Sequence, residues 1–334
     1  MRIGRRAAFG GLSTAFAFSN ATAQQEIVFF RIGTGGQIGT YFPVGGLLAN
    51  AISNPPGSRP CDDGGSCGVP GLVATAVASG GSDANVLALA SGRMQSAFVQ
   101  SDIANWAQTG TGLYEGKAKV EELRAIANLY PESVHVVTRK DSRIATIGDL
   151  KGRRVSLDER GSGTLVDARL ILAAYGLSEN DLQLAYMKSR AAGEKMQAGQ
   201  LDAFFSVSGW PEGGIAELAA TTDVTLVPIS SPQREALAEK HGFFALDEIP
   251  ANTYRNVPAT KTVSVNAVWV TTSKQPEGLI YGVTAALWHP STRKLLDSGH
   301  PKGKAIRFES ALHGLGIPLH PGAARFYKEK GALR

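Results

Sequence analysis

The chain has 334 residues, of which 43% are hydrophobic and 19% charged, and this length is enough for two globular domains of ordinary size. Its formal net charge is +5, but residues 1–23 hold three arginines and no acidic residue, so the remainder has 31 basic and 29 acidic side chains. Because the charge is nearly balanced and no dense basic patch with interleaved aromatic residues occurs, we do not expect a nucleic-acid partner.

Residues 1–23 have the pattern of a signal peptide. Three arginines within the first six residues precede an uncharged, mostly apolar stretch at 7–18, which is too short to span a bilayer. Ala21-Thr22-Ala23 supplies a cleavage sequence and argues against a retained anchor. We therefore expect export to the periplasm with cleavage after about Ala23, by either the general secretory or the twin-arginine route.

A glycine-rich turn follows the first expected strand, at residues 27–32. Four glycines lie between positions 33 and 39, and apolar residues then recur at helical spacing from Leu47. Backbone N–H groups converge at such a helix start and suit an anionic group. A dinucleotide-binding fingerprint fits poorly, because the third glycine is off register and no acidic residue lies near position 53. A turn without a ligand is the other alternative. The binding residues expected here are Thr34, Gly35, Gly36 and Tyr41.

Cys61 and Cys67 are the only cysteines, and they flank a flexible Asp-Asp-Gly-Gly-Ser loop. A disulfide is the default expectation for such a pair in an exported protein, and a metal site would need more soft ligands nearby. The same loop matches the Gly-x-Ser-x-Gly motif of α/β-hydrolases around Ser66. That motif requires a strand before the serine and a helix after it, so we interpret the match as chance.

Further strand–turn–helix units follow along the chain. The strands expected at 72–78 and 96–100 lead into Ser79-Gly-Gly-Ser82 and Ser101-Asp102, where either a ligand or simple helix capping would explain the polar residues. Short strands are expected at 124–129 and 133–138, and residues 263–272 read as a return strand. We therefore expect a discontinuous first domain, 24–138 with 263–334, and a second domain, 139–262. In the second domain, turns at Gly161-Ser162-Gly163-Thr164 and Ser208-Gly209 again end strands, and Trp210 covers either a ligand or the domain edge.

These motifs together resemble the TAXI family, the TRAP-associated extracytoplasmic solute receptors. The resemblance rests on Gly-Thr-Gly-Gly-x-x-Gly-Thr-Tyr-Phe-Pro-Val-Gly-Gly from Gly33, on the turns above and on residues 201–211 and 317–328, and it covers about residues 26 to 330. It implies an α/β, two-domain periplasmic binding protein fold with a ligand cleft, a structural disulfide in the cysteine loop, and TRAP-type membrane transporter subunits as partners. The expected solute is a small carboxylate such as glutamate or 2-oxoglutarate, or an amino acid. From the same resemblance, the site also includes Ser79, Gly80, Gly81, Ser82, Asn85, Gln100, Ser101 and Asp102.

The chemistry of the motifs favours binding over catalysis. No His-Glu-x-x-His sequence and no Walker A sequence occurs, so we expect neither a catalytic metal nor a cofactor. The glycine–Ser/Thr turns supply backbone and hydroxyl donors but no obvious general base. We therefore expect a non-enzymatic receptor that closes its two domains on the solute. A secreted hydrolase or transferase of the same architecture and a periplasmic ligand sensor are the alternatives, and the sequence leaves the ligand's identity open.

Overall fold

The computed structural model describes residues 26–333. The expected signal peptide at 1–23 lies outside these described residues. Within them, no helix combines the length and the apolar character needed to cross a membrane.

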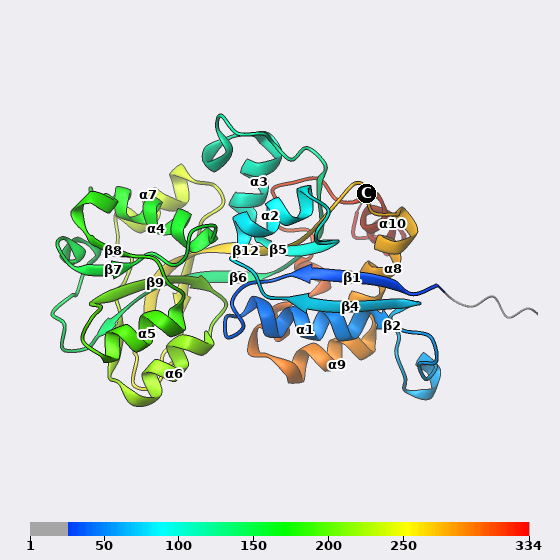
Figure 1. Cartoon of the computed structure of the whole chain (residues 1–334), viewed down its shortest axis with the longest axis horizontal. Helices are drawn as coiled ribbons and strands as arrows, with labels where there is room; N and C mark the ends of the chain where they lie inside the picture. Colours follow the sequence, from blue (N-terminus) through cyan, green and yellow to red (C-terminus); the bar gives the residue numbers. More distant parts are fainter. Residues whose placement is uncertain (1–25, 334) are drawn as a thin grey trace, which may run out of the picture.

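A mixed sheet of ten strands runs through the molecule (Figure 1), and its main strand order is β4-β1-β5-β12-β6-β9-β7-β8. β10 pairs with β6, and β11 pairs with β12. The pairs of β1 with β4 and β5, and of β7 with β8 and β9, are parallel, whereas β12 and β6 pair antiparallel to each other and to their other neighbours. The strands are β1 Val28–Gly33, β4 Leu72–Val77, β5 Ser96–Gln100, β6 Leu123–Arg139, β7 Arg154–Ser156, β8 Gln183–Ala185, β9 Ala203–Ser208, β10 Val224–Leu226, β11 Ala245–Ile249 and β12 Thr260–Thr272, with a separate pair β2 Ser53–Asn54 and β3 Val69–Pro70.

Two lobes lie on either side of β6 and β12 (Figure 1). Lobe 1 contains β1, β4 and β5 with helices α1 Tyr41–Ile52, α2 Ser82–Ala90, α3 Ser101–Thr109, α8 Glu277–Leu287, α9 Pro290–Gly299 and α10 Pro321–Glu329. Lobe 2 contains β7, β8 and β9 with α4 Gly163–Ala174, α5 Ser189–Gln197, α6 Gly213–Thr221 and α7 Gln233–Lys240. Short 3-10 helices are η1 Cys61–Asp63, η2 Gly112–Tyr114, η3 Ile147–Leu150, η4 Glu179–Asp181, η5 Pro301–Ala305 and η6 Phe308–Ser310.

The long strand β6 replaces the two short strands expected at 124–129 and 133–138. Pro131, in the middle of β6, has no backbone N–H, and this suggested a break in the strand. In the structure Pro131 is exposed and pairs with Asn266, beside a register shift in the β6–β12 pairing. The strand therefore continues through the proline, and the sheet is continuous across both lobes.

Each lobe has hydrophobic clusters of its own. Ile126 to Tyr130 of β6 pack with Trp269 and the C-terminal helices in lobe 1, whereas Val134 and Val136 pack with the helices of lobe 2. The cores thus change over within β6 and β12, around residues 131–133 and 266, while the sheet itself does not break. The division at 138 and 263 stays a prediction.

The cysteine loop lies at the end of lobe 1 that is farther from lobe 2 (Figure 1). Cys61 and Cys67 form a disulfide with a Cα–Cα distance of 4.7 Å, which confirms the predicted bridge. Ser66 lies in the loop between η1 and β3 and donates its hydroxyl hydrogen to the Ser53 carbonyl. Because no strand leads into Ser66 and no helix follows it, this serine has none of the geometry of a hydrolase nucleophile.

Candidate functional site

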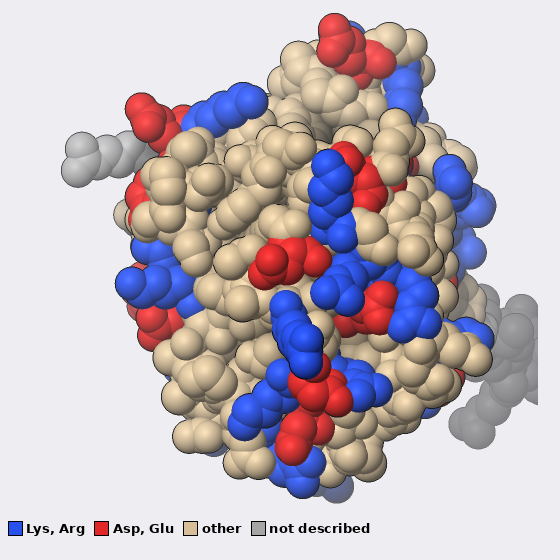
Figure 2. Space-filling view, turned by 90° about the vertical axis from the view of Figure 1, so that its left-hand side faces the viewer, with Lys and Arg blue, Asp and Glu red and all other residues tan. Residues whose placement is uncertain are grey.

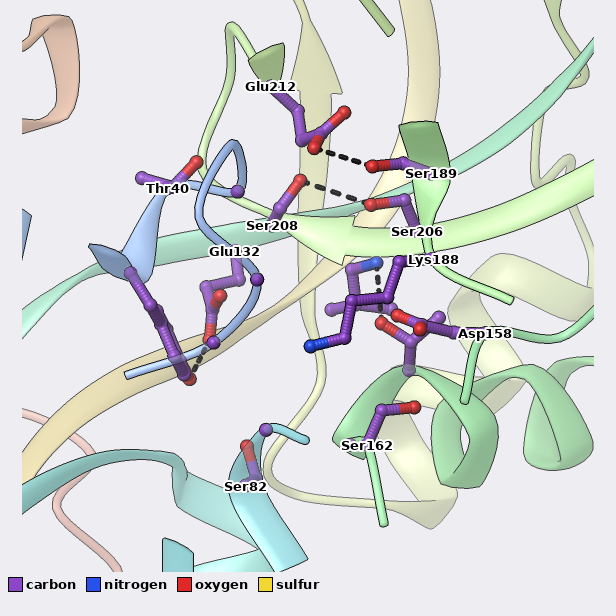
Figure 3. A pocket seen from close by; sticks show the side chains of 18 of the residues that line it. Thr40, Ser82, Glu132, Asp158, Ser162, Lys188, Ser189, Ser206, Ser208 and Glu212 are labelled. Carbon is purple, nitrogen blue, oxygen red and sulfur yellow. Dashed lines mark hydrogen bonds between the residues drawn. The ribbon is translucent and has the colours of Figure 1, made fainter. Parts of the chain in front are cut away.

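A cavity of about 90 Å³ lies between the lobes, at the carboxyl ends of the strands. The first residues of α1, α2, α4 and α5, and Glu212, the residue that precedes α6, all reach it. Five helix N-termini therefore converge on one small volume, and each brings partial positive charge and backbone N–H donors. Figure 3 shows the hydroxyl and carboxyl side chains that line this cavity.

Eleven of the residues expected in the site line the cavity. They are Gly35, Gly36, Tyr41, Gly80, Gly81, Ser82, Gln100, Ser162, Gly163, Thr164 and Ser208. Seven do not line it, namely Thr34, Ser79, Asn85, Ser101, Asp102, Gly161 and Gly209. The glycine–hydroxyl turns of the two halves of the sequence are thus brought together, while part of each turn is used for the fold.

Thr34 and Asn85 connect the ends of three strands. The Thr34 hydroxyl donates to the Val77 carbonyl at 2.7 Å, and the Asn85 side-chain amide donates to the carbonyls of Thr34 and Phe98 at 2.7 and 2.8 Å. Both side chains are fully buried. These contacts fix the relative positions of β1, β4 and β5, so the two residues hold the turn in place and do not face the cavity.

Hydroxyl groups in the site are already hydrogen-bonded within the protein. The Ser82 Oγ accepts from the backbone N–H of Gln100 at 3.1 Å, and the Thr164 Oγ1 accepts from that of Val207 at 3.0 Å. Ser162 caps α4 by accepting from the Leu165 N–H at 3.2 Å. Ser82 and Thr164 each keep a hydroxyl hydrogen that can be donated elsewhere, because their oxygen acts as the acceptor in these bonds.

The two lobes touch each other around the cavity. The Thr40 hydroxyl donates to the Gly209 carbonyl, and the Lys188 ammonium group donates to the Ser79 carbonyl, both at 2.5 Å. Lys188 extends across the space between the lobes in Figure 3. The side chain of Gln100 from lobe 1 occupies the place that a Cβ at Gly163 would need, with Oε1 only 1.5 Å from it. The structure therefore shows the lobes in a closed arrangement.

Three carboxyl groups line the cavity, and burial raises the pKa of each. The pKa of Glu132 is raised to about 8, although the hydrogen bond from Tyr41 lowers it in part. Burial raises the pKa of Asp158 to about 7, and it raises the pKa of Glu212 as well. Asp158 has a backbone φ of 72°, a left-handed conformation that is uncommon outside glycine. The protonated forms of Glu132 and Asp158 can donate hydrogen bonds into the cavity at neutral pH.

Ten of the lining residues are not among those expected from the sequence: Ile38, Gly39, Thr40, Glu132, Asp158, Lys188, Ser189, Ser206, Val207 and Glu212. Thr40 lies in the predicted glycine-rich turn, one residue before Tyr41, so its position carried a usable signal. Asp158 directly follows the strand expected at 154–157, where polar residues commonly face a ligand. Glu132 lies inside a strand, and nothing in the local pattern indicates that it faces a cavity.

Glu212 and Ser189 form the one pair among the lining residues that suggests catalysis. The Ser189 hydroxyl donates to Glu212 Oε1 at 2.8 Å, but Glu212 Oε2 also accepts from the Ile215 N–H and caps α6. No histidine lines the cavity. Elsewhere in the described residues, Cys61, Cys67 and His289 are the one group with metal-ligand spacing, and the disulfide consumes both sulfurs. A structural role explains the Ser189–Glu212 pair.

The protein has two lobes, two long strands that run through both lobes within one sheet, and a cavity at the strand ends. This is the two-domain fold of periplasmic binding proteins, as the sequence predicted. A solved structure of PhnD1 from Prochlorococcus marinus in complex with methylphosphonate has a TM-score of 0.51 at 11% identity, covering 91% of this chain and 99% of that one. A protein of Bordetella bronchiseptica RB50 gives 0.50 at 16% identity, with coverages of 92% and 89%. The alkanesulfonate-binding protein SsuA from Xanthomonas axonopodis pv. citri, bound to MOPS, gives 0.44 at 15% identity, with coverages of 92% and 95%.

The chain belongs to the NMT1-like family, whose model matches residues 32–331. This match overturns the resemblance to the TAXI family, which is wrong, and the TRAP-type transporter subunits expected as partners are wrong with it. The motifs behind that resemblance are short glycine–hydroxyl turns between a strand and a helix. Such turns follow from the geometry of the fold and do not by themselves distinguish one family of receptors from another.

Proposed function

We propose that this chain is an exported solute-binding receptor that encloses a small carboxylate or an amino acid between its lobes and delivers it to a membrane permease. The observation that carries the proposal is the convergence of five helix N-termini on one cavity between two lobes. Backbone N–H groups at helix starts hold anions without a buried counter-ion. The volume of about 90 Å³ fits a small solute only.

The charged groups around the cavity support an acidic solute that carries further polar groups. Lys188 provides a positive charge at one wall, although it also contacts the Ser79 carbonyl and lies 3.6 Å from Glu159. Glu132 and Asp158 donate hydrogen bonds when they are protonated and accept them when they are ionised. The ionised carboxyl groups could therefore bind the ammonium group of an amino acid, and the protonated ones could donate to its carboxylate.

Closure of the lobes is the mechanism that we propose for capture. In the closed arrangement the cavity walls come from both lobes, so separation of the lobes would widen the way in for a solute. β6 and β12 are the connections on which such a hinge would act. Closing removes water around the solute and strengthens its hydrogen bonds to the helix starts.

Calorimetric titration of the mature protein tests the proposal. The panel contains L-glutamate, 2-oxoglutarate, L-arginine, L-alanine, methylphosphonate and methanesulfonate. We expect saturable binding of a carboxylate or an amino acid and a loss of affinity of about tenfold or more for Ser82→Ala and Thr164→Ala, because each hydroxyl contributes on the order of 1.4 kcal/mol or more. Ser66→Ala is the control and should bind as the wild type does. If methylphosphonate were the one compound that bound, the proposed solute would be a phosphonate and not a carboxylate.

The enzyme alternative has its own test. If Ser189 acted as a nucleophile with Glu212 as its base, the protein would hydrolyse an activated ester such as p-nitrophenyl acetate, and Ser189→Ala would abolish this activity. We expect no turnover above that of the Ser189→Ala variant. Turnover that depends on Ser189, together with absent solute binding, would replace the receptor with a hydrolase.

A further inference from the structure

Two buried aspartates face each other across the boundary between the lobes. Asp102 lies in the first turn of α3 in lobe 1, and Asp167 lies in α4 of lobe 2. Both side chains are fully buried, with no exposed surface. In the described part of the chain, none of their four carboxyl oxygens has a hydrogen-bond partner, and each carboxyl group lies close enough to the other to affect its pKa.

Two ionised carboxylates would repel each other strongly in such a place. No basic side chain is among the groups that act on either aspartate. Burial raises the pKa of Asp102 to about 7, whereas the backbone N–H groups of Ile103 and Asp102 lower it in part. Burial and the charges of Asp102 and Glu132 raise the pKa of Asp167 well above its ordinary value. One proton on the pair removes the repulsion and supplies the missing donor.

The neighbouring elements contribute few other charges. Those packed against α3 and α4 are α2, η2, α7 and the strands β5, β6, β9 and β12. Some of their titratable groups have other partners: Asp83 accepts from Tyr114, Arg234 pairs with Glu235, and His135 contacts Tyr254. The remaining ones are Arg124, Tyr130, Glu132 and Arg139 on β6, Glu239 and Lys240 on α7, and Lys261 on β12. Glu132 acts on Asp167, and Lys302 in turn acts on Glu132.

We propose that Asp102 and Asp167 form a proton-dependent latch that holds the two lobes closed. In the closed state one carboxylic acid donates its hydrogen to the other carboxylate, and the pair separates into water when the lobes open. Closing therefore takes up a proton, and opening releases it. The latch rests on the proposed hinge but not on the identity of the solute, because neither aspartate lines the cavity.

The direction of the pH effect follows from this linkage. The closed state binds the proton more tightly than the open state, in which each aspartate titrates near its ordinary pKa. The ratio of closed to open molecules consequently falls as the pH rises, by roughly tenfold for each pH unit between the pKa of the open state and that of the closed pair.

Infrared spectroscopy detects the proton without any solute. The difference spectrum of wild type minus Asp167→Asn at pH 6 should show the C=O stretch of a protonated carboxyl group, and Asp102→Asn should also change this band. Asp223→Asn, which removes an exposed aspartate of lobe 2, is the matched control and should leave the band unchanged. A wild type without a protonated carboxyl band that depends on these two residues would overturn the latch.

Spin-label distances test the effect on closure. Labels on Lys294→Cys in α9 and Glu194→Cys in α5, two exposed positions on different lobes, report the separation of the lobes between pH 5.5 and 8.5. The long-distance population should grow with pH in both proteins, because Glu132 and Asp158 are also buried between the lobes. It should grow less steeply in Asp167→Asn, whose amide donates without a proton, and equal slopes in the two proteins would contradict the latch. If added CaCl2 raised the melting temperature of the wild type but not that of Asp167→Asn, the pair would be a cation-binding site and not a latch.

If the calorimetric panel finds no solute while these spectroscopic results hold, the latch stands and the receptor function fails. If a solute binds but the infrared band and the difference in slope between the two proteins are absent, the receptor stands and the latch fails.

Discussion

The hydroxyl of Tyr41 donates a hydrogen bond of 2.6 Å to Oε2 of Glu132, and both side chains are buried. Tyr41 begins α1, Glu132 lies in the middle of β6, and ninety residues separate them in the chain. This bond lowers the pKa of Glu132, which burial raises. It joins the glycine-rich turn to the strand that runs between the lobes.

Tyr41→Phe should therefore leave a buried carboxyl group without its donor. We expect the free energy of unfolding at pH 7 to fall by about 1–3 kcal/mol, the usual cost of an unsatisfied buried group. Urea unfolding of both proteins measures this. Tyr281→Phe is the matched control, since the Tyr281 hydroxyl also donates to a glutamate, Glu329, but at the surface, and it should have a far smaller effect. Equal losses in the two variants would contradict the importance of burial at Glu132.

Glu132→Gln should change how stability depends on pH. A carboxyl group whose pKa is raised to about 8 binds its proton more tightly in the folded than in the unfolded protein, so its contribution to stability is full at low pH and is lost as the pH rises toward 8. Below pH 8 and above about 4.5, this group alone lowers the unfolding free energy by up to roughly 1.4 kcal/mol per pH unit. Unfolding curves across this range should be flatter for Glu132→Gln. A slope equal to that of the wild type would show that Glu132 is not protonated when folded.

His135 should act in the opposite direction at lower pH. Burial lowers its pKa to about 4, and its ring contacts the Tyr254 hydroxyl at 2.9 Å. The unfolded protein binds this proton more tightly, so stability is lost as the pH falls from 6.5 toward 4. His135→Gln should weaken that acid sensitivity, as measured by melting temperatures at pH 4.5 and 6.5. A larger difference in melting temperature between pH 4.5 and pH 6.5 in the variant than in the wild type would contradict this role of His135.

Gly163→Ala should prevent closure without harming the fold. The added Cβ would lie 1.5 Å from Gln100 Oε1, whereas alanine is the better helix former. We expect an unchanged or slightly higher melting temperature and solute binding weakened beyond detection. The double variant Gly163→Ala/Gln100→Ala removes the clash and should recover part of the affinity. Wild-type binding by the single variant would show that Gln100 moves aside at little cost.

Removal of the disulfide should destabilise the protein modestly. The bridge closes a loop of six residues' separation, for which loop-closure entropy gives roughly 2 kcal/mol. The Cys61→Ala/Cys67→Ala variant should lose about this much unfolding free energy and still bind solute, because the bridge lies away from the cavity. Mass spectrometry of periplasmic protein without reductant checks the bridge itself, and two free thiols would contradict it.

Local patterns in the sequence predicted the strand–turn–helix units well. Each unit lies within about twenty residues, and glycines with apolar periodicity mark where a strand ends and a helix begins. What the polar residues in those turns do was harder to predict. Thr34 and Asn85 tie strands together, while Ser82 and Gln100 reach the cavity, and the same residue types serve both purposes.

The remaining site residues depend on contacts between distant segments. Glu132 faces the cavity only because β6 passes between the lobes, and Lys188 reaches it only when lobe 2 lies against lobe 1. Pro131 hid the continuity of β6 for the same reason, since its pairing partner lies more than a hundred residues away. No spacing rule within a short window contains this information.

The charge distribution also could not be read from composition. Acidic and basic side chains are interspersed over the end of lobe 2 in Figure 2, so this face has no large area of one sign. Ion pairs of lobe 2 include Arg154 with Asp202 and Arg190 with Glu217. Such pairs at the surface contribute little to stability.

The return of the chain through β12 has a consequence for biosynthesis. Trp269 and the helices α8 to α10 complete the core of lobe 1, so the N-terminal segments made first have no finished partner until synthesis is almost over. Lobe 2 has all its strands and helices, including Val263 and Val265, before the last of these segments appears. The middle of the polypeptide can thus fold before its beginning, which reverses the N-to-C order usual for multidomain chains.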